Sequence, residues 1–136
     1  MKQIKIDLGK LLLRIGVGGL MLFHGIAKLM HGFQGIKDLL IAKGLPEFLW
    51  IGALLGEVFA PICILLGVMT RFSSVLVAIT MVFAMYLVYG TTALSLGKNG
   101  IPVAELNLLF FLASLALACI GGGRYALYKK ETGIFA

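Results

Sequence analysis

Charge is scarce in this chain of 136 residues, because only 13% of them are charged and 60% are apolar. A soluble domain carries about 45–50% apolar and about 25% charged residues. The chain therefore lacks the polar surface that would cover a soluble enzyme, and its apolar content excludes a disordered protein. The class that remains is an integral membrane protein with an all-α fold.

Several motifs that carry chemistry are also missing. The sequence has no Gly-rich phosphate loop, zinc-ligand spacing or serine–histidine–acid set, which argues against hydrolase and nucleotide chemistry. Cys63 and Cys119 lie far apart in apolar runs and outside any C-x-x-C, so they indicate neither a disulfide framework nor a metal site. His24 and His31 are separated by about 10 Å along or beside one helix, so they cannot ligate opposite faces of one haem in a monomer, which leaves single-His ligation or a dimeric site. Haem is therefore disfavoured as a cofactor.

Four apolar runs predict a bundle of four transmembrane helices, with the whole chain (1–136) as one domain. The runs cover approximately residues 8–30, 48–69, 72–89 and 103–120. Each is close to the roughly 20 residues that a helix needs to cross a bilayer. Between the first two runs, GIKDLLIAKG has apolar residues at helical spacing, which predicts a short interfacial amphipathic helix ending near Gly44. So little chain remains that a large redox cofactor must lie within the bundle or belong to a partner.

Basic residues flank the apolar runs and predict the orientation of the chain in the membrane. With four spans, both termini lie on one side, together with seven basic residues: Lys2, Lys5, Lys10, Arg71, Arg124, Lys129 and Lys130. The other side has three: Lys37, Lys43 and Lys98. This asymmetry predicts that both termini lie in the cytoplasm. The net charge of +6 is then explained by orientation and contact with anionic lipid, without a nucleic-acid partner.

Ionisable residues within the apolar runs are the most informative candidates for a site. They are Arg14, His24 and Lys28 in the first run, Glu57 in the second and Glu105 in the fourth. A charged residue at a helix centre costs about 2.5–3.5 kcal/mol on insertion scales. We therefore expect these side chains to face the bundle interior and to pair.

The spacing in the first run shows how they can pair. A 4,3,4,3 pattern places five residues on one stripe of a helix: Arg14, Gly18, Met21, Gly25 and Lys28. His24 borders this stripe, one turn before Lys28. We expect one polar pocket toward the outer face to combine His24, Lys28, Glu57 and Glu105. Arg14 lies deeper, with Glu57 as its nearest acid.

Glycines mark surfaces where helices can approach closely. Gly52 and Gly56 are four residues apart in the second run, and Gly16, Gly18 and Gly19 cluster in the first. Small residues at such spacing let the backbones of membrane helices come into contact. We interpret both groups as helix-packing surfaces.

Each ionisable residue also has a structural interpretation. Lys28 and Glu57 either neutralise each other and fix helix packing, or form a site that handles protons or a ligand. Glu105 can be an acid that the first turn of its helix favours. His24 titrates in the range that suits proton transfer, and it can equally be a hydrogen-bonded residue of the bundle.

The whole chain resembles the DoxX family of small bacterial membrane proteins. The resemblance rests on ordered segments: LLLRIGVGGLMLFHGIAKL, KGLP, GEVFAPICILLGVMTR and AELNLLFFLASLALACIGGGRYAL. It implies a four-helix membrane protein linked to redox metabolism, since some relatives look like the membrane subunit of thiosulfate:quinone oxidoreductase and others are associated with oxidative stress or quinone resistance. The positions that match the family pattern are Arg14, His24, Gly25, Lys28, Glu57, Arg71, Glu105 and Asn107.

The leading hypothesis is a membrane subunit of a quinone-linked oxidoreductase or an oxidative-stress redox system. Glu57 and His24 are the candidate catalytic residues for proton handling. The candidate ligand-binding residues are Arg14, Lys28, Glu105 and Asn107, with quinone as the ligand and no metal ligands. Electrons would come from a redox partner protein or a diffusible reductant. The alternatives are a small oligomeric transporter or channel, and a membrane assembly or anchor protein without chemistry; a homo-oligomer is compatible with all three.

Overall fold

The computed structural model describes residues 1–128. Lys129 and Lys130, which enter the charge asymmetry above, lie outside the described residues. The first helix is continuous and consists of α1 (Lys2–Arg14), a π-helical turn (Ile15–Gly19) and α2 (Leu20–His31). The short helix α3 (Gln34–Ala42) follows. The second long helix comprises a 3-10 turn (Glu47–Leu49), α4 (Trp50–Leu54), a π-helical turn (Leu55–Phe59) and α5 (Ala60–Leu66). Helices α6 (Thr70–Tyr89) and α7 (Glu105–Ile120) complete the described chain.

These elements confirm the all-α class, because no strand occurs among residues 1–128. Two helices, Glu47–Leu66 and Thr70–Thr92, are long and apolar enough to cross a membrane. Helix α7 is apolar but has 16 residues. Helix α3 forms where the amphipathic pattern predicts it, and the chain leaves it at Gly44 with a φ of 68°, a conformation that favours glycine.

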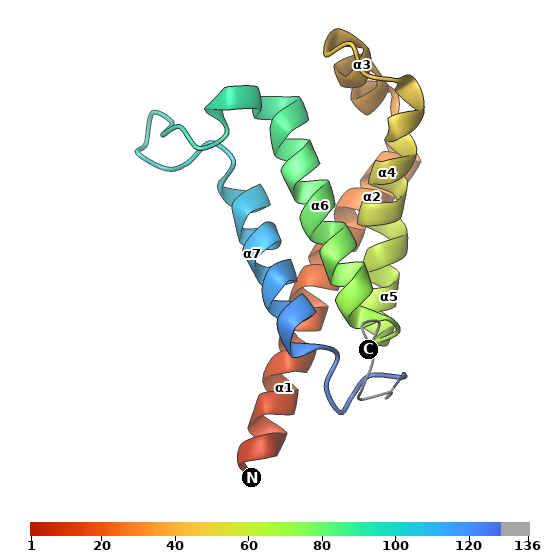
Figure 1. Cartoon of the computed structure of the whole chain (residues 1–136), viewed down its shortest axis with the longest axis vertical. Helices are drawn as coiled ribbons and strands as arrows, with labels where there is room; N and C mark the ends of the chain where they lie inside the picture. Colours follow the sequence, from red (N-terminus) through yellow and green to blue (C-terminus); the bar gives the residue numbers. More distant parts are fainter. Residues whose placement is uncertain (129–136) are drawn as a thin grey trace.

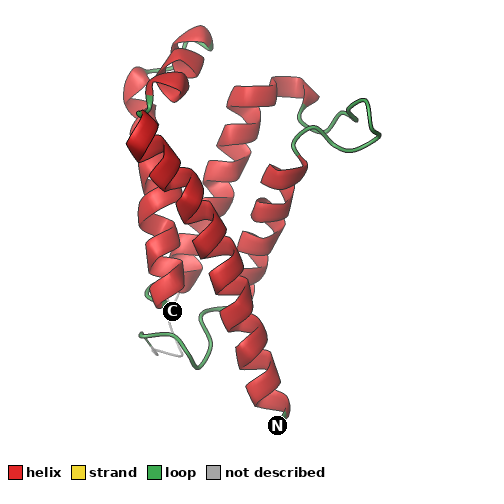
Figure 2. Ribbon diagram, turned by 180° about the vertical axis from the view of Figure 1, so that it is seen from behind, coloured by secondary structure: helices red, strands yellow, loops and turns green. Residues whose placement is uncertain are grey.

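The long helices pack lengthwise and diverge toward one end. Figure 1 shows α1 at the end that also holds the α5–α6 turn and residues 121–128, which we call the terminal end. Helix α3 lies across the opposite end, which we call the α3 end (Figure 2). The buried core lies between these ends and contains apolar side chains from all four long helices: Val17, Met21, Ala60, Ile64, Val77, Met81, Phe110 and Leu117.

The π-helical turn in the second long helix has a local cause in the sequence. Pro61 follows it directly, at the start of α5. A proline inside a helix has no N–H to donate and its ring collides with the carbonyl four residues earlier, which here is that of Glu57. Widening the helix over Leu55–Phe59 relieves this collision. Such turns are frequent at functional sites, and this one contains Glu57.

Glycines permit the closest helix contacts. A Cβ at Gly18 would press against Leu65 and Pro61, and a Cβ at Gly25 would collide with the carbonyl group of Glu57. A Cβ at Gly56 would collide with the side chain of Thr80 on α6. The glycines therefore set how α2, the second long helix and α6 meet.

Candidate functional site

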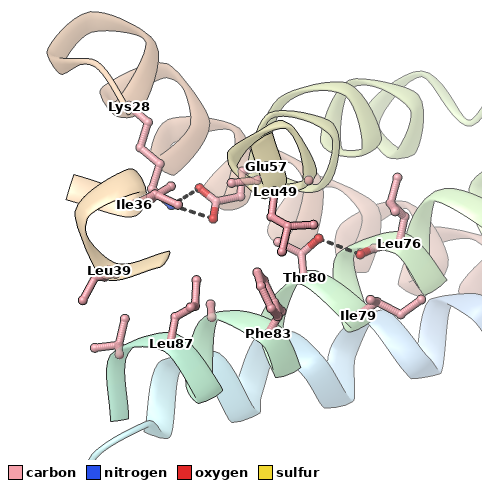
Figure 3. A pocket seen from close by; sticks show the side chains of 14 residues that line it. Lys28, Ile36, Leu39, Leu49, Glu57, Leu76, Ile79, Thr80, Phe83 and Leu87 are labelled. Atoms are coloured by element: carbon pink, nitrogen blue, oxygen red, sulfur yellow. Dashed lines mark hydrogen bonds and ion pairs between the residues drawn. The ribbon is translucent and has the colours of Figure 1, made fainter. Parts of the chain in front are cut away.

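An ion pair joins the first and second long helices. The ammonium nitrogen Nζ of Lys28 donates to Oε1 of Glu57 at 2.6 Å and lies 2.5 Å from Oε2 (Figure 3). The side chain of Glu57 is 5% exposed and that of Lys28 is 33% exposed. Gly25 makes this contact possible, because its lack of a side chain lets α2 lie against the backbone of Glu57. The pairing predicted for Lys28 and Glu57 is thus present.

The ion pair lines one side of a pocket of about 280 Å³, which we call the Lys28–Glu57 pocket. Ligand pockets measure about 300–1,000 Å³, so this one is small but of a relevant size. Its remaining lining is almost entirely apolar: Ile36, Leu39, Leu49, Gly52, Ala53, Leu76, Ile79, Thr80, Phe83, Ala84, Leu87 and Val88. The hydroxyl of Thr80 donates to the carbonyl of Leu76 at 2.8 Å. Lys28 and Glu57 are the charged residues of the lining.

Thr80 of the pocket lining contacts Gly56 of the second long helix. There the second long helix and α6 touch so closely that a side chain at position 56 would not fit. Toward the α3 end the two helices diverge, as Figure 1 shows for α4 and α6. The pocket lies between these two helices, with Lys28 of α2 and residues of α3 completing its lining.

Helix α3 covers the pocket at the far end. Ile36 and Leu39 contribute to the lining, and Leu40 is fully buried. On the α4 side, Lys37 pairs with Glu47 at 3.1 Å and its Nζ lies 5.3 Å from the ring centre of Trp50. These contacts hold α3 as a roof over the Lys28–Glu57 pocket.

The roof is also attached to α6. Nζ of Lys43, just beyond the end of α3, lies 5.0 Å from the ring centre of Tyr86. Phe33, just before α3, packs on Trp50 with ring centres 4.9 Å apart. The roof therefore bridges the two helices that diverge beneath it.

Arg14 lies at the terminal end, away from the Lys28–Glu57 pocket. It is 1% exposed, and its guanidinium donates to three backbone carbonyls: Ile64 at 2.8 Å, Leu65 at 2.6 Å and Gly122 at 3.2 Å. The first two belong to the last turn of α5, where a helix leaves carbonyls unpaired and carries partial negative charge. The structure thus gives Arg14 backbone partners and no contact with Glu57.

The other predicted site residues also lie outside the pocket lining. His24 is exposed and its ring meets that of Phe110 on α7 edge-on, with ring centres 6.2 Å apart. Glu105 is exposed in the first turn of α7, and Nδ2 of Asn107 lies 3.8 Å from the sulfur of Met81. Of the four side chains expected to share one pocket, the structure brings together Lys28 and Glu57. The ligand and proton roles of His24, Glu105, Asn107 and Arg14 stay predictions.

Sequence reasoning missed most of the pocket wall. Thr80, Phe83 and Leu87 stand in a uniformly apolar run that gives no sign of which face meets a cavity. The one available signal was the Gly52-x-x-x-Gly56 spacing. Gly52 is part of the pocket lining, and Gly56 contacts Thr80 of the lining. Among residues 1–128, no group of three or more His, Cys, Asp or Glu is placed to hold a metal ion.

Helices alone in the described part of the chain, two of them long and apolar enough to cross a membrane, are typical of a small membrane protein. The sequence matches the DoxX family over residues 9–90, more than half of the chain, and the protein belongs to this family. The DoxX family is membrane-associated, which agrees with the apolar helices. The match includes Arg14, Lys28 and Glu57.

A relative extends this similarity along the chain. The sequence is 31% identical over 121 residues to the Bacillus subtilis (strain 168) protein named "Putative oxidoreductase CatD". The aligned part covers 89% of this chain and 85% of CatD, so the two are similar over nearly their whole lengths. No solved structure matches the chain significantly.

Proposed function

We propose that the protein is the membrane subunit of a quinone-linked oxidoreductase or oxidative-stress redox system, with four helices crossing the bacterial inner membrane and both termini in the cytoplasm. Membership of the DoxX family supports the membrane part. The oxidoreductase in the name of the CatD relative supports the redox part. The Lys28–Glu57 pocket supports a small apolar ligand with polar groups.

The observation that carries the proposal is a Lys–Glu ion pair on the wall of an otherwise apolar pocket. A quinone has a flat apolar ring and two carbonyl oxygens. The ring fits the apolar wall, and the ammonium of Lys28 can donate to a carbonyl oxygen. The carboxylate of Glu57 can accept and pass on protons. Few other membrane-soluble molecules need an apolar wall and a proton-exchanging pair at one place.

The reaction sets what the chain must supply. Reduction of a quinone to a quinol takes two electrons and two protons. In this proposal a redox partner protein delivers both electrons. Both protons come from water: the ammonium of Lys28 donates one to a ring oxygen and is reprotonated, and the carboxylate of Glu57 takes up the other and passes it to the second oxygen. The one-third exposure of the Lys28 side chain keeps the pair accessible for this exchange.

Binding of decylubiquinone in mild detergent tests the proposal. Trp50 is the sole tryptophan and neighbours Leu49 of the pocket lining, so quinone binding is followed by quenching of its fluorescence. Glu57→Gln and Lys28→Met should each raise Kd at least about tenfold, because a hydrogen bond to a charged group contributes about 1.5–3 kcal/mol. Glu47→Gln, which removes a carboxylate paired with lysine outside the pocket, should leave Kd unchanged. Absence of saturable binding, or equal Kd values in all four proteins, contradicts the proposal.

A further inference from the structure

The Lys28–Glu57 pocket has a closed side and an open side. Glu57 and Thr80 are 4% and 8% exposed and lie on the closed side, where Thr80 contacts Gly56. Several other lining residues are open to the surroundings, among them Gly52, which is exposed, Ile79, which is 60% exposed, and Val88, which is 58% exposed. Gly52 lies on α4 and Ile79 on α6, so the opening separates these two helices. We call this opening the Gly52–Ile79 entrance.

The entrance faces the apolar surface of the molecule. Its neighbours Leu55, Val75 and Val82 are exposed apolar side chains on the same two helices. Both helices are long and apolar enough to lie in a membrane. A molecule that reaches the pocket through this entrance therefore comes from the hydrocarbon region of a bilayer.

The two sides of the pocket differ in polarity, as do the polar head and the apolar tail of a lipid-like molecule. The closed side carries the charged pair that can contact polar atoms, and the entrance carries no charged residue. The pocket volume of about 280 Å³ is close to the lower limit for ligand sites. A ring with a long tail does not fit inside completely, so the tail must leave through an apolar opening.

We infer that the Gly52–Ile79 entrance is a lateral port through which a tailed quinone enters from the bilayer, with its ring at Lys28 and Glu57 and its tail between Gly52 and Ile79. This inference rests on the proposed function and adds to it a substrate class: quinones with an apolar tail, as opposed to water-soluble quinones. Helix α3 contributes Ile36 and Leu39 to the lining toward the membrane surface, away from this port. Gly52 acts as a specificity-determining residue, because any side chain there narrows the port.

Gly52 offers a substitution that tests the port without disturbing the fold. A Cβ at this position meets nothing within 4 Å, so Gly52→Phe places its ring in open space beside the entrance. Gly9→Phe is the matched control, because Gly9 is also an exposed helical glycine with nothing within 4 Å, and it lies on α1 far from the pocket. A thermal melt of each variant verifies folding. Ile79→Phe narrows the same port from α6 and provides a second test.

The experiment compares two ligands with the same ring, decylubiquinone and the tail-free dimethoxy-methyl benzoquinone, by quenching of Trp50 fluorescence. Gly52→Phe should weaken decylubiquinone binding about tenfold, the loss expected when roughly two methylene groups lose their contacts. The tail-free ring should lose clearly less affinity than decylubiquinone, and Gly9→Phe should match the wild type for both ligands. Ile79→Phe should show the same selectivity for the tail.

The outcomes separate the port from the proposed function. Unchanged binding of decylubiquinone to Gly52→Phe and Ile79→Phe, with binding still sensitive to Glu57→Gln, overturns the port and leaves the quinone site intact. Equal weakening of both ligands also overturns the port, since the substitution would then act on the ring. Failure of either ligand to bind the wild type saturably contradicts the quinone site itself.

Discussion

The first helix carries two cations in apolar surroundings, Arg14 and Lys28, and they have different partners at the two ends of the molecule. At the terminal end, Arg14 is enclosed and bonded to three backbone carbonyls of α5 and the following chain. At the α3 end, Lys28 meets a carboxylate and stays one-third exposed beside a pocket. The donors of Arg14 are occupied by the protein's own backbone, whereas Lys28 has a carboxylate partner and lies beside the space of the pocket. The partners of a buried charge, more than its burial, indicate what it can do.

The difference extends to the surroundings of each cation. At the terminal end, every carbonyl of the last turn of α5 has a donor: the N–H of Val68 bonds to Cys63, Arg14 to Ile64 and Leu65, and the N–H of Leu127 to Leu66. Gly67 ends the helix in the left-handed conformation that favours this closure. At the α3 end, the helices diverge and leave the space that forms the pocket. The terminal end thus stabilises the bundle, and the α3 end leaves room for a ligand.

The largest effect on stability is expected from Arg14. Arg14→Met removes the donors of three carbonyls at once, and a hydrogen bond to a charged group contributes about 1.5–3 kcal/mol, so we expect a loss of about 3 kcal/mol or more in the free energy of unfolding. Quinone binding per folded molecule should not change. Unfolding in detergent, followed by the loss of helical circular dichroism, measures this. A variant as stable as the wild type would show that the comparison between the two cations is wrong.

Part of this comparison could be predicted from the sequence. The 4,3,4,3 stripe places Arg14, Gly18, Met21 and Gly25 on one face, and all four are buried. Burial of charge in an apolar run forces pairing, which predicted the partnership of Lys28 with Glu57. The partners of Arg14 could not be predicted, because backbone carbonyls are present at every residue and only the path of the chain beyond α5 selects them.

The next largest effect is expected at the helix contact behind the ion pair. Gly25→Ala places a methyl group against the carbonyl of Glu57, and overpacking of this kind costs about 1–3 kcal/mol. Gly52→Ala places the same methyl group in open space, where a helix gains about 0.5–1 kcal/mol from alanine. The free energy of unfolding, measured by chemical denaturation, should therefore fall in Gly25→Ala and rise in Gly52→Ala. Equal changes would mean that Gly25 does not set the distance between the helices.

The pocket itself was beyond sequence reasoning for a physical reason. The pocket lies between the second long helix and α6, which touch at Gly56 and diverge toward the α3 end. The angle at which two apolar helices cross depends on all their side chains together. The same reason explains why His24 is separated from Glu57. It borders the buried stripe, and a shift of one position around a helix turns a side chain by about 100°, here toward Phe110 on α7.

A smaller effect on stability is expected from replacing the ion pair as a unit. Lys28→Met combined with Glu57→Leu exchanges two charges for apolar side chains, and such exchanges are often neutral or stabilising. We expect the free energy of unfolding to stay within about 1 kcal/mol of the wild type, because no uncompensated charge remains. Decylubiquinone binding should be lost. Retained decylubiquinone binding would contradict the role of the ion pair in the site.

The smallest effect is expected at the ion pair that holds the roof to α4. Glu47 is 54% exposed in its side chain and pairs with Lys37, outside the pocket. Exposed pairs contribute about 0.2–1 kcal/mol, so Glu47→Gln should lower the free energy of unfolding by no more than about 0.5 kcal/mol. Because the cation of Lys37 keeps its contact with Trp50 and the burial of Leu40 is untouched, α3 stays in place and Kd for decylubiquinone stays constant. The pair differs from Lys28–Glu57 in its greater exposure and in its position outside the pocket. A change in Kd as large as that of Glu57→Gln would therefore contradict a specific role of the Lys28–Glu57 pair in binding.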